Sequence, residues 1–345
     1  MTLHPLTPDP TAWDAFVAAH PRAHLLQLSA WGALKAAFGW TPAHVALADD
    51  AGTLVAGAQM LLRPLPARLG TLAYVPCGPL VDWADAAQVG ALLDALDAEA
   101  RRRGAILLKI EPGLGLDGAD FARFGFRPSP QTIQPPRTIV LDLSGDDEAI
   151  LARMNQGTRR NIRKSARFEV AIRQGVREDV ARFNALLAET GTRDEFGVHA
   201  PDYYQRAYDL FAPAGRAALI LGSYGGQDLA GVMVFRLGEW AWYFYGASSD
   251  RERQRMASYG VQWAGIQWAK AGGARWYDLY GVPDAEPDAL EAQFESRSDG
   301  LWGVYRFKRG WGGQVVRGAG AWDRVYRPPL YALYRLAVRL LHRVE

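Results

Sequence analysis

The chain has 345 residues, of which 49% are hydrophobic and 22% charged, and its formal net charge is +2. This length fits two domains, and the hydrophobic fraction excludes a chain that is disordered throughout. The near balance of 39 Lys and Arg residues against 37 Asp and Glu residues excludes binding of nucleic acid through overall charge, so any such contact requires a local basic patch.

The first helix of chemical interest is predicted within residues 25–40, LLQLSAWGALKAAFGW. Ser29 is a candidate N-cap, and helical spacing brings Trp31, Leu34 and Lys35 together on one side. A lysine is unusual on so apolar a helix, and only five of the 39 basic residues are lysine. Lys35 is therefore a candidate binding residue, with exposure of its amine at the surface as the alternative.

Two stretches of the chain repeat one order of elements. Residues 44–80 and 217–249 each predict three strands, and in both the second strand opens with Ala-Gly, at 56–57 and at 230–231. A helix and a buried strand follow, at 86–112 and at 258–284. The repeated order predicts an α+β fold of two tandem domains with mixed sheets, and a chance recurrence is the alternative.

The same element order is that of acetyltransferase-type (GNAT) domains. The Gly-rich segment with which such domains hold acyl-CoA is not found, and GLGLDG at 113–118 is predicted to be a turn. The boundary between the copies falls near residues 138–154, where Ser144 or Asp146 is a candidate helix cap. We predict a first domain of residues 1–141 with 319–345, and a second domain of residues 142–318.

The densest basic run, residues 153–177, holds eight basic residues against the single acid Glu169, a local charge of +7. Much of it has a helical pattern, with Arg159, Arg163 and Arg167 on one face. A near-neutral protein needs such a patch to hold a polyanion. We expect any RNA contact here to be with the backbone, and a solvated helix face is the alternative.

Residues 189–204, ETGTRDEFGVHAPDYY, have no strong periodicity and predict a binding loop. Its candidate groups are Arg193, Asp194, Glu195, His199, Tyr203 and Tyr204. Carboxylates recur near the ends of two repeat-equivalent strands, as Glu111 and as Asp278 with Asp284. Clefts form at such strand ends, although the spacing names no metal or glycosidase site.

Residues 300–313, GLWGVYRFKRGWGG, alternate aromatic and basic side chains. The alternation predicts a strand with Tyr305, Phe307 and Arg309 on one face and Arg306 and Lys308 on the other. The last segment ends in a predicted helix with apolar and basic positions, which are Leu333, Leu336, Ala337, Leu340 and Leu341, with Arg335, Arg339 and Arg343. We expect it to pack on the first domain, with contact with an anionic membrane surface as the alternative.

Cys77 is the single cysteine, so the chain forms no intrachain disulfide and no zinc site of several thiolates. The six histidines show no metal-ligand spacing, and we expect neither a metal nor a cofactor. The N-terminus lacks the basic and apolar regions of a signal peptide, and no apolar run approaches the roughly 18 residues of a membrane span. These observations predict a cytoplasmic protein, which we expect to be a monomer.

The motifs in order resemble the Fem family of peptidoglycan-bridge aminoacyltransferases, over about residues 20–335. They are HLLQLSAWGALKAAFGW, LAYVPCGPL, LLKIEP, TRRNIRKSA, YFYGASS and GLWGVYRFKRGWGG. The resemblance implies two GNAT-like domains and transfer of Gly, Ala or Ser from aminoacyl-tRNA. The acceptor would be the side-chain amine of stem-peptide residue 3, on UDP-MurNAc-pentapeptide or on lipid II. No heptad stretch occurs between 165 and 230, so the chain resembles members without a helical arm.

The resemblance also implies roles for individual residues. Lys35, with Trp31 beside it, and Arg193 would bind the muramyl precursor at its pyrophosphate. Tyr243 and Tyr245 would line the peptide cleft. Phe307, Lys308 and Glu111 match family positions near the reaction centre, and Lys308 would stabilise negative charge during transfer. The tRNA would contact the residues Arg159, Arg160, Arg163 and Lys164, and Cys77 stands where a basic residue is frequent.

No covalent enzyme intermediate is needed, because the acceptor amine attacks an ester that is already activated. Two alternatives remain open at this point. One is another GNAT-type N-acyltransferase, against which the missing acyl-CoA segment argues. The other is a non-catalytic protein that binds RNA or a murein precursor.

Overall fold

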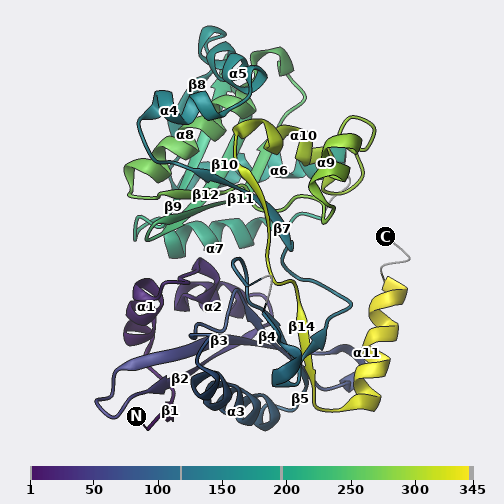
Figure 1. The fold of residues 1–345 in the computed structure, drawn as a ribbon. Helices are drawn as coiled ribbons and strands as arrows, with labels where there is room; N and C mark the ends of the chain where they lie inside the picture. The colour runs from purple at the N-terminus through teal and green to yellow at the C-terminus, as the bar shows by residue number, and fades with distance from the viewer. Residues whose placement is uncertain (1, 117–118, 195–196, 342–345) are drawn as a thin grey trace. The chain divides into compact units, whose positions relative to one another are not determined.

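The computed structural model describes residues 2–116, 119–194 and 197–341. The chain divides into two compact units, one of Met1–Pro136 with Arg317–Glu345 and the other of Arg137–Val316. Within the described residues, each unit holds a seven-stranded mixed sheet with helices packed on it (Figure 1). The predicted α+β fold is therefore confirmed. No helix of the described ranges has the length and apolar character to cross a bilayer.

The first sheet has the strand order β1-β2-β3-β4-β5-β14-β6, in which β4 and β5 run parallel. Its strands are β1 (His4–Leu6), β2 (Thr41–Ala48), β3 (Leu54–Pro64), β4 (Thr71–Pro76), β5 (Ala105–Glu111), β6 (Arg127–Pro128) and β14 (Trp322–Val325). The helices of this unit are α1 (Pro10–Ala19), α2 (Ser29–Ala36), α3 (Ala86–Arg102) and α11 (Pro328–Leu341). Helix α3 buries Val89, Leu92 and Leu96 against one face, and α1 and α2 lie on the other (Figure 1).

The second sheet has the order β13-β7-β12-β11-β10-β9-β8, in which β11 and β12 run parallel. Its strands are β7 (Arg137–Asp142), β8 (Ala171–Gln174), β9 (Ala217–Tyr224), β10 (Gln227–Leu237), β11 (Trp240–Ser248), β12 (Trp276–Asp278) and β13 (Gln314–Arg317). The helices are α4 (Asp147–Arg153), α5 (Gln156–Arg167), α6 (Val180–Asp194), α7 (Pro201–Phe211), α8 (Ala257–Ala271), α9 (Pro287–Gln293) and α10 (Trp302–Lys308). Helix α8 packs on β9 and β10 through Val261 and Ile266.

The two units contain the predicted repeat, since β2–β5 with α3 and β9–β12 with α8 follow the same order and strand directions. The repeated Ala-Gly pair has a packing cause. A Cβ on Gly57 would lie 2.7 Å from the Trp13 ring, and a Cβ on Gly231 would lie 2.8 Å from the Phe183 ring. Each glycine therefore makes room for an aromatic ring from a helix on the same sheet face.

In each sheet, the last strand of the repeat pairs with a strand that lies outside the repeat and is distant in sequence. β7 pairs antiparallel with β12, and β14 pairs antiparallel with β5. Because of the first pairing, the division between units falls before Arg137, whereas the sequence places it after residue 141. Asp146 caps α4 by accepting from the Ala149 amide at 2.8 Å, as one of the two predicted caps.

Three local predictions are wrong. Residues 302–311 form α10 and a 3-10 turn rather than a strand, because the buried side chains Trp302, Tyr305 and Lys308 recur every three residues. Most of the predicted loop at 189–204 is helical, in α6 and α7, and Glu195 lies outside the described residues. Ser29 is the first residue of α2 rather than its cap, and its hydroxyl donates to Asp14 at 2.7 Å.

Candidate functional site

Lys308 is a buried lysine at the end of α10, with 6% of its surface exposed. Its Nζ donates to the carbonyl oxygens of Tyr280 at 2.6 Å and Gly281 at 2.7 Å. An ammonium has three N–H groups, so these bonds leave one for a further acceptor. Burial lowers the pKa of the Lys308 amine to about 7, against the opposing charge of Asp278.

Asp278 is the last residue of β12 and is the acidic neighbour of this amine. Its carboxylate accepts from the Thr138 hydroxyl of β7 and from the Tyr280 amide at 2.7 Å. Burial raises the pKa of Asp278 to about 6, and the Lys308 charge opposes that rise. The sequence marks Asp278 as a carboxylate at a strand end but assigns it no role, because only the fold brings Thr138 and Lys308 to it.

The two predicted cleft tyrosines of β11 have different neighbours. The Tyr243 ring centroid lies 5.7 Å from Lys308 Nζ, a cation–π distance. The Tyr245 hydroxyl instead donates to the Tyr203 hydroxyl at 3.3 Å, and its ring packs edge-on against Tyr204 at 5.1 Å. A register shift in the pairing of β10 with β11 falls between the partners of these two tyrosines. Tyr243 therefore lies beside Lys308, whereas Tyr245 packs against the aromatic rings of α7.

Phe307 and Arg193 are placed by contacts within the second unit. Phe307 packs edge-on against Tyr259 at 5.1 Å and Trp311 at 5.6 Å, which fixes the end of α10. Arg193, near the end of α6, donates to the Ser248 carbonyl at 2.8 Å and pairs with Asp250 at 3.2 Å. Its guanidinium thus reaches the end of β11.

Glu111 is the counterpart of Asp278 at the end of β5 in the first unit. It accepts from the Tyr74 hydroxyl, from the Ile133 amide at 2.5 Å and from the Gln134 amide at 3.0 Å. Burial raises the pKa of Glu111, and these three hydrogen bonds oppose the rise. Its carboxylate therefore holds the segment at 133–134 against β4 and β5.

Lys35 lies on α2 with its Nζ 4.8 Å from the centroid of the buried Trp31 ring. Burial, and secondarily the charge of Arg63, lower the pKa of the Lys35 amine to about 8. Arg63 itself lies over the Trp40 ring at 5.3 Å, and Trp40 is 6.1 Å from Tyr74. Two cations thus stand close enough to repel each other, which favours an anion beside them.

Residues 156–167 of the basic run form α5, which confirms the predicted helix, whereas Arg153, Arg173 and Arg177 lie in α4, β8 and a 3-10 turn. Arg160, Arg163 and Arg167 are exposed, and among the described residues no carboxylate pairs with them. Lys164 lies over the Phe168 ring at 5.3 Å. Arg159 differs, because it donates to the carbonyl oxygens of Ala152 at 3.3 Å and Met154 at 2.6 Å, at the end of α4.

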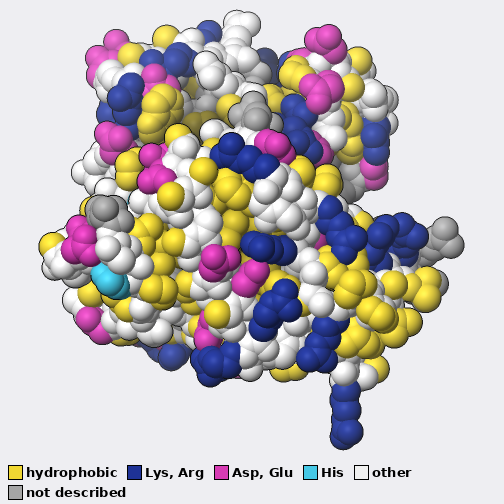
Figure 2. Space-filling view, turned by 60° about the horizontal axis from the view of Figure 1, so that its bottom comes forward, with side chains coloured by type: hydrophobic (Ala, Val, Ile, Leu, Met, Phe, Trp, Pro, Cys, Tyr) yellow, Lys and Arg dark blue, Asp and Glu magenta, His cyan; other side chains and the backbone are white. Residues whose placement is uncertain are grey.

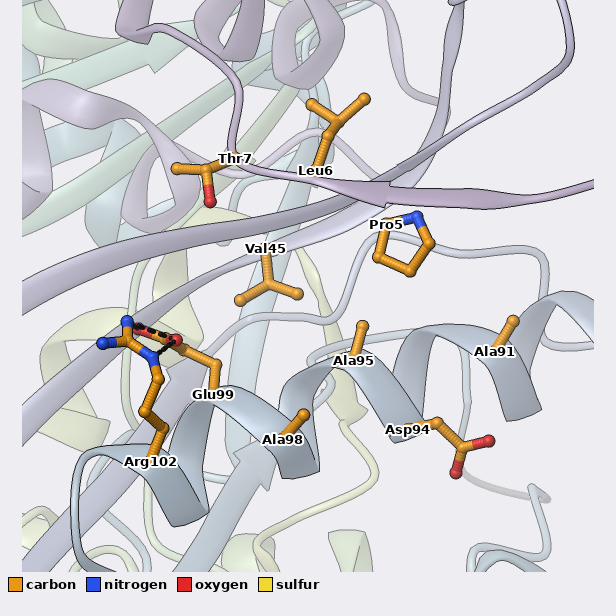
Figure 3. Close-up of a pocket in the computed structure, with 10 residues that line it drawn as sticks. All are labelled: Pro5, Leu6, Thr7, Val45, Ala91, Asp94, Ala95, Ala98, Glu99 and Arg102. Carbon is orange, nitrogen blue, oxygen red and sulfur yellow. Dashed lines mark hydrogen bonds and ion pairs between the residues drawn. The ribbon is translucent and has the colours of Figure 1, made fainter.

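A pocket of about 480 Å³ lies between β1, β2 and α3 (Figure 3). Apolar side chains such as Leu6, Val45 and Ala95 line it, and the ion-paired Glu99 and Arg102 stand at one end. None of the predicted site residues lines this pocket. In the parts of the chain that the structure describes, no three His, Cys, Asp or Glu side chains gather as a metal site.

The FemAB family model matches residues 9–126, 117–225 and 217–339 of this chain. A lipid II:glycine glycyltransferase of Staphylococcus saprophyticus is 27% identical and covers 93% of this chain and 93% of that protein. The protein of the same name from Staphylococcus haemolyticus is 28% identical, with 93% and 92% covered. The first of these alignments spans 395 positions, more than the 345 residues here, so that relative has residues without a counterpart in this chain.

Among solved structures, the crystal structure of FemX has a TM-score of 0.86 at 23% identity and covers 96% of this chain and 99% of its own. A tandem GNAT protein from the clavulanic acid biosynthesis pathway has a TM-score of 0.53 at 14% identity, with 93% and 98% covered. At these identities the likeness is one of fold, and it confirms the predicted pair of GNAT-like domains.

Proposed function

This chain belongs to the FemAB family, and on that premise we propose that it transfers an amino acid from aminoacyl-tRNA to the third residue of the peptidoglycan stem peptide. The observation that carries the proposal is the similarity to lipid II:glycine glycyltransferases over 93% of both chains. It favours lipid II over UDP-MurNAc-pentapeptide as the acceptor, and glycine over alanine or serine as the amino acid. The product is an amide on the side-chain amine of that residue, the first link of an interpeptide bridge.

Lys308 is the residue that we assign to the chemical step. When the amine attacks the aminoacyl ester, negative charge develops on the carbonyl oxygen and then on the departing ribose oxygen. An ammonium that is already held by two backbone carbonyls meets that charge without reorganising. Phe307, packed between Tyr259 and Trp311, keeps this end of α10 in place.

The acceptor amine must lose a proton before it attacks, since the pKa of a lysine amine is near 10.4 in water. Transfer to a site with few waters lowers that pKa, and alignment of the two substrates supplies much of the rate. Glu111 is not needed as the base, because its carboxylate accepts three hydrogen bonds from its own unit. The amine attacks the ester directly, so no covalent enzyme intermediate forms: the amide C–N bond forms, the ester C–O bond breaks, and the proton released by the amine ends on the departing ribose oxygen, which leaves as a hydroxyl.

Charged and aromatic groups bind the substrates. On the first unit, Lys35 beside Trp31 binds the pyrophosphate of the precursor. On the second unit, Arg193 binds an anionic group of the substrates, and Tyr243 and Tyr245 contact a peptide. The exposed face of α5 binds the tRNA backbone through Arg160 and Arg163 together with Lys164. Arg159 contributes to this face indirectly, by holding α4 against α5.

The test is mass spectrometry of precursor peptides after incubation of the full-length protein with a pool of charged tRNAs. Lipid II and UDP-MurNAc-pentapeptide are supplied in separate reactions, and acetyl-CoA replaces the tRNA in a third. We expect a gain of one glycyl residue on lipid II. A gain of an alanyl or seryl residue would correct the proposed amino acid and leave the rest of the proposal in place. Failure to modify either acceptor would contradict the proposal, and acetylation in the third reaction would identify an acyl-CoA enzyme instead.

A further inference from the structure

Helix α11 has two faces with different chemistry. Tyr331 and Tyr334 are buried, and their hydroxyls donate to Asp323 at 2.8 Å and to Gln131 at 2.9 Å. Through this face the helix packs on the first unit. Leu333 and Leu336, on the other face, are 51% and 55% exposed.

The exposed apolar face extends along the described part of the helix. Its exposed members are Pro328, Pro329, Ala332, Leu333, Leu336 and Ala337. Val176 is comparably exposed, at 56%, but it belongs to the second unit and is therefore no part of this face. The side chains of Leu340 and Leu341, and Arg343, lie outside the described residues. Monomeric proteins rarely leave such a continuous apolar face uncovered without a partner.

Basic side chains border this face. Arg327 and Arg339 are exposed, Arg335 is half-buried, and within the described ranges none of the three pairs with a carboxylate. From Tyr326 to Val344 the sequence contains no Asp or Glu. Figure 2 shows the hydrophobic side chains gathered over α11 with Lys and Arg on both sides of them. Leucines bordered by arginines that have no carboxylate partner in the described part of the chain complement a surface that is apolar inside and anionic outside.

We propose that the exposed face of α11 docks on an anionic lipid bilayer, with Leu333 and Leu336 among the acyl chains and the arginines at the headgroups. The inference deepens the proposed function and rests on it in one respect, because a lipid-linked acceptor lies at such a surface. The packing of Tyr331 and Tyr334 fixes this face to the first unit. Docking would therefore hold that unit at the membrane.

The direct test is flotation of the full-length protein with vesicles of phosphatidylcholine alone, or with 30 mol% phosphatidylglycerol, without tRNA or precursor. We expect binding to the anionic vesicles only. Leu336→Glu should lower the bound fraction at least tenfold, and Leu333→Glu with Leu336→Glu should abolish binding. The matched control is Val176→Glu, which changes an equally exposed side chain of the second unit and should bind as the wild type does.

The charge component is tested with Arg327→Gln and Arg339→Gln together. This pair should weaken binding and reduce its dependence on salt, whereas Arg68→Gln with Arg206→Gln, an equal loss of charge elsewhere, should not. Equal binding of the wild type and the double-leucine variant would overturn the proposal. A dimer that dissociates on Leu336→Glu, with no vesicle binding, would assign the face to a second copy and overturn it as well.

Transfer assays then separate this inference from the proposed function. The double-leucine variant should lose transfer to lipid II in vesicles and keep any transfer to soluble UDP-MurNAc-pentapeptide. A wild-type protein that floats with anionic vesicles but modifies neither acceptor would contradict the proposed function alone. A wild-type protein that modifies lipid II without floating would contradict the docking alone.

Discussion

Lys308 and Asp278 both hydrogen-bond to the backbone of Tyr280, Lys308 as a donor to its carbonyl and Asp278 as an acceptor from its amide. Lys308 donates to the carbonyl of Gly281 as well. Tyr280 has a left-handed φ of 51°, which a non-glycine residue adopts only when its surroundings hold it there. Amine and carboxylate therefore depend on one turn, and each shifts the pKa of the other toward its charged form.

We expect Lys308→Met to lower kcat by about 10²- to 10³-fold with little change in the KM for either substrate. The reason is that the ammonium acts on charge that develops only during transfer. The measurement is single-turnover transfer of the amino acid, with circular dichroism to verify folding. Lys270→Met, which removes a half-buried lysine paired with Asp147, is the control and should keep the wild-type rate. An unchanged kcat in Lys308→Met would refute the assigned role.

The charge of Lys308 also predicts a pH dependence. Its protonated form is the active one, so the rate of the wild type relative to Lys308→Met should fall as pH rises through about 7. Taking this ratio removes the effects of pH on the acceptor amine and on the ester. Asp278→Asn keeps an oxygen for Thr138 and Tyr280 but removes the charge that raises the Lys308 pKa. The falling limb should then move to lower pH, and a shift to higher pH would exclude this coupling.

Glu111→Gln is expected to lower the free energy of unfolding by about 1–3 kcal/mol. An amide offers one oxygen where the carboxylate accepts three donors, so its NH₂ group would face a backbone N–H that has lost its acceptor. Urea denaturation measures the change. Glu286→Gln, an exposed partner of Arg137, should cost less than about 1 kcal/mol. Full stability together with a large loss of kcat would instead make Glu111 a catalytic base.

Because burial raises the pKa of Glu111, the free energy of unfolding should depend on pH. The contribution of this carboxyl is fully present below the unfolded pKa of about 4.5 and is lost as pH rises through the folded value. The stability difference between the wild type and Glu111→Gln should therefore move against the wild type over that interval. Constant differences across it would show that the carboxyl titrates as it does in the unfolded chain.

The repeat and the helices with a clear period were predictable because their signals are local. The Ala-Gly pairs and the arginines at 159, 163 and 167 place strands and a helix without knowledge of the fold. The helix at 302–308 was not predictable from alternation, because Lys308 is polar by type yet occupies a buried position beside Trp302 and Tyr305. Prediction from sequence assumes that a lysine is exposed, and Lys308 is an exception because it is buried.

Site partners distant in sequence were beyond the reach of spacing. Asp278 hydrogen-bonds to Thr138 only because β7, which is distant in sequence, pairs with β12 in the second sheet. The sequence likewise counts Arg159 as a free cation, whereas its guanidinium binds backbone carbonyls at the end of α4. Charge can be counted from the sequence, but the partner of a charge depends on the fold.

The basic face of α5 predicts a salt-dependent contact with tRNA. Changing Arg160, Arg163 and Arg167 to Gln should raise the KM for aminoacyl-tRNA, leave kcat unchanged and reduce the salt slope of log KM by about one per arginine. Steady-state kinetics at several salt concentrations give these values. The triple variant of Arg68, Arg206 and Arg253 to Gln removes the same charge elsewhere and should keep the wild-type slope. Equal slopes for the two triple variants would locate the tRNA contact elsewhere.

The cations on the first unit predict how the acceptor is bound. We expect Lys35→Met to raise the KM for the acceptor about 10- to 100-fold with little effect on kcat, because it removes a charged hydrogen bond to the pyrophosphate. The Lys35 amine loses its charge as pH rises through its pKa of about 8, so the wild-type KM should climb above that pH. Arg63→Gln removes a charge that lowers this pKa, so the rise in KM should begin at higher pH. Lys270→Met again serves as the control, and a rise that begins at lower pH in Arg63→Gln would contradict the assignment of Lys35 to the pyrophosphate.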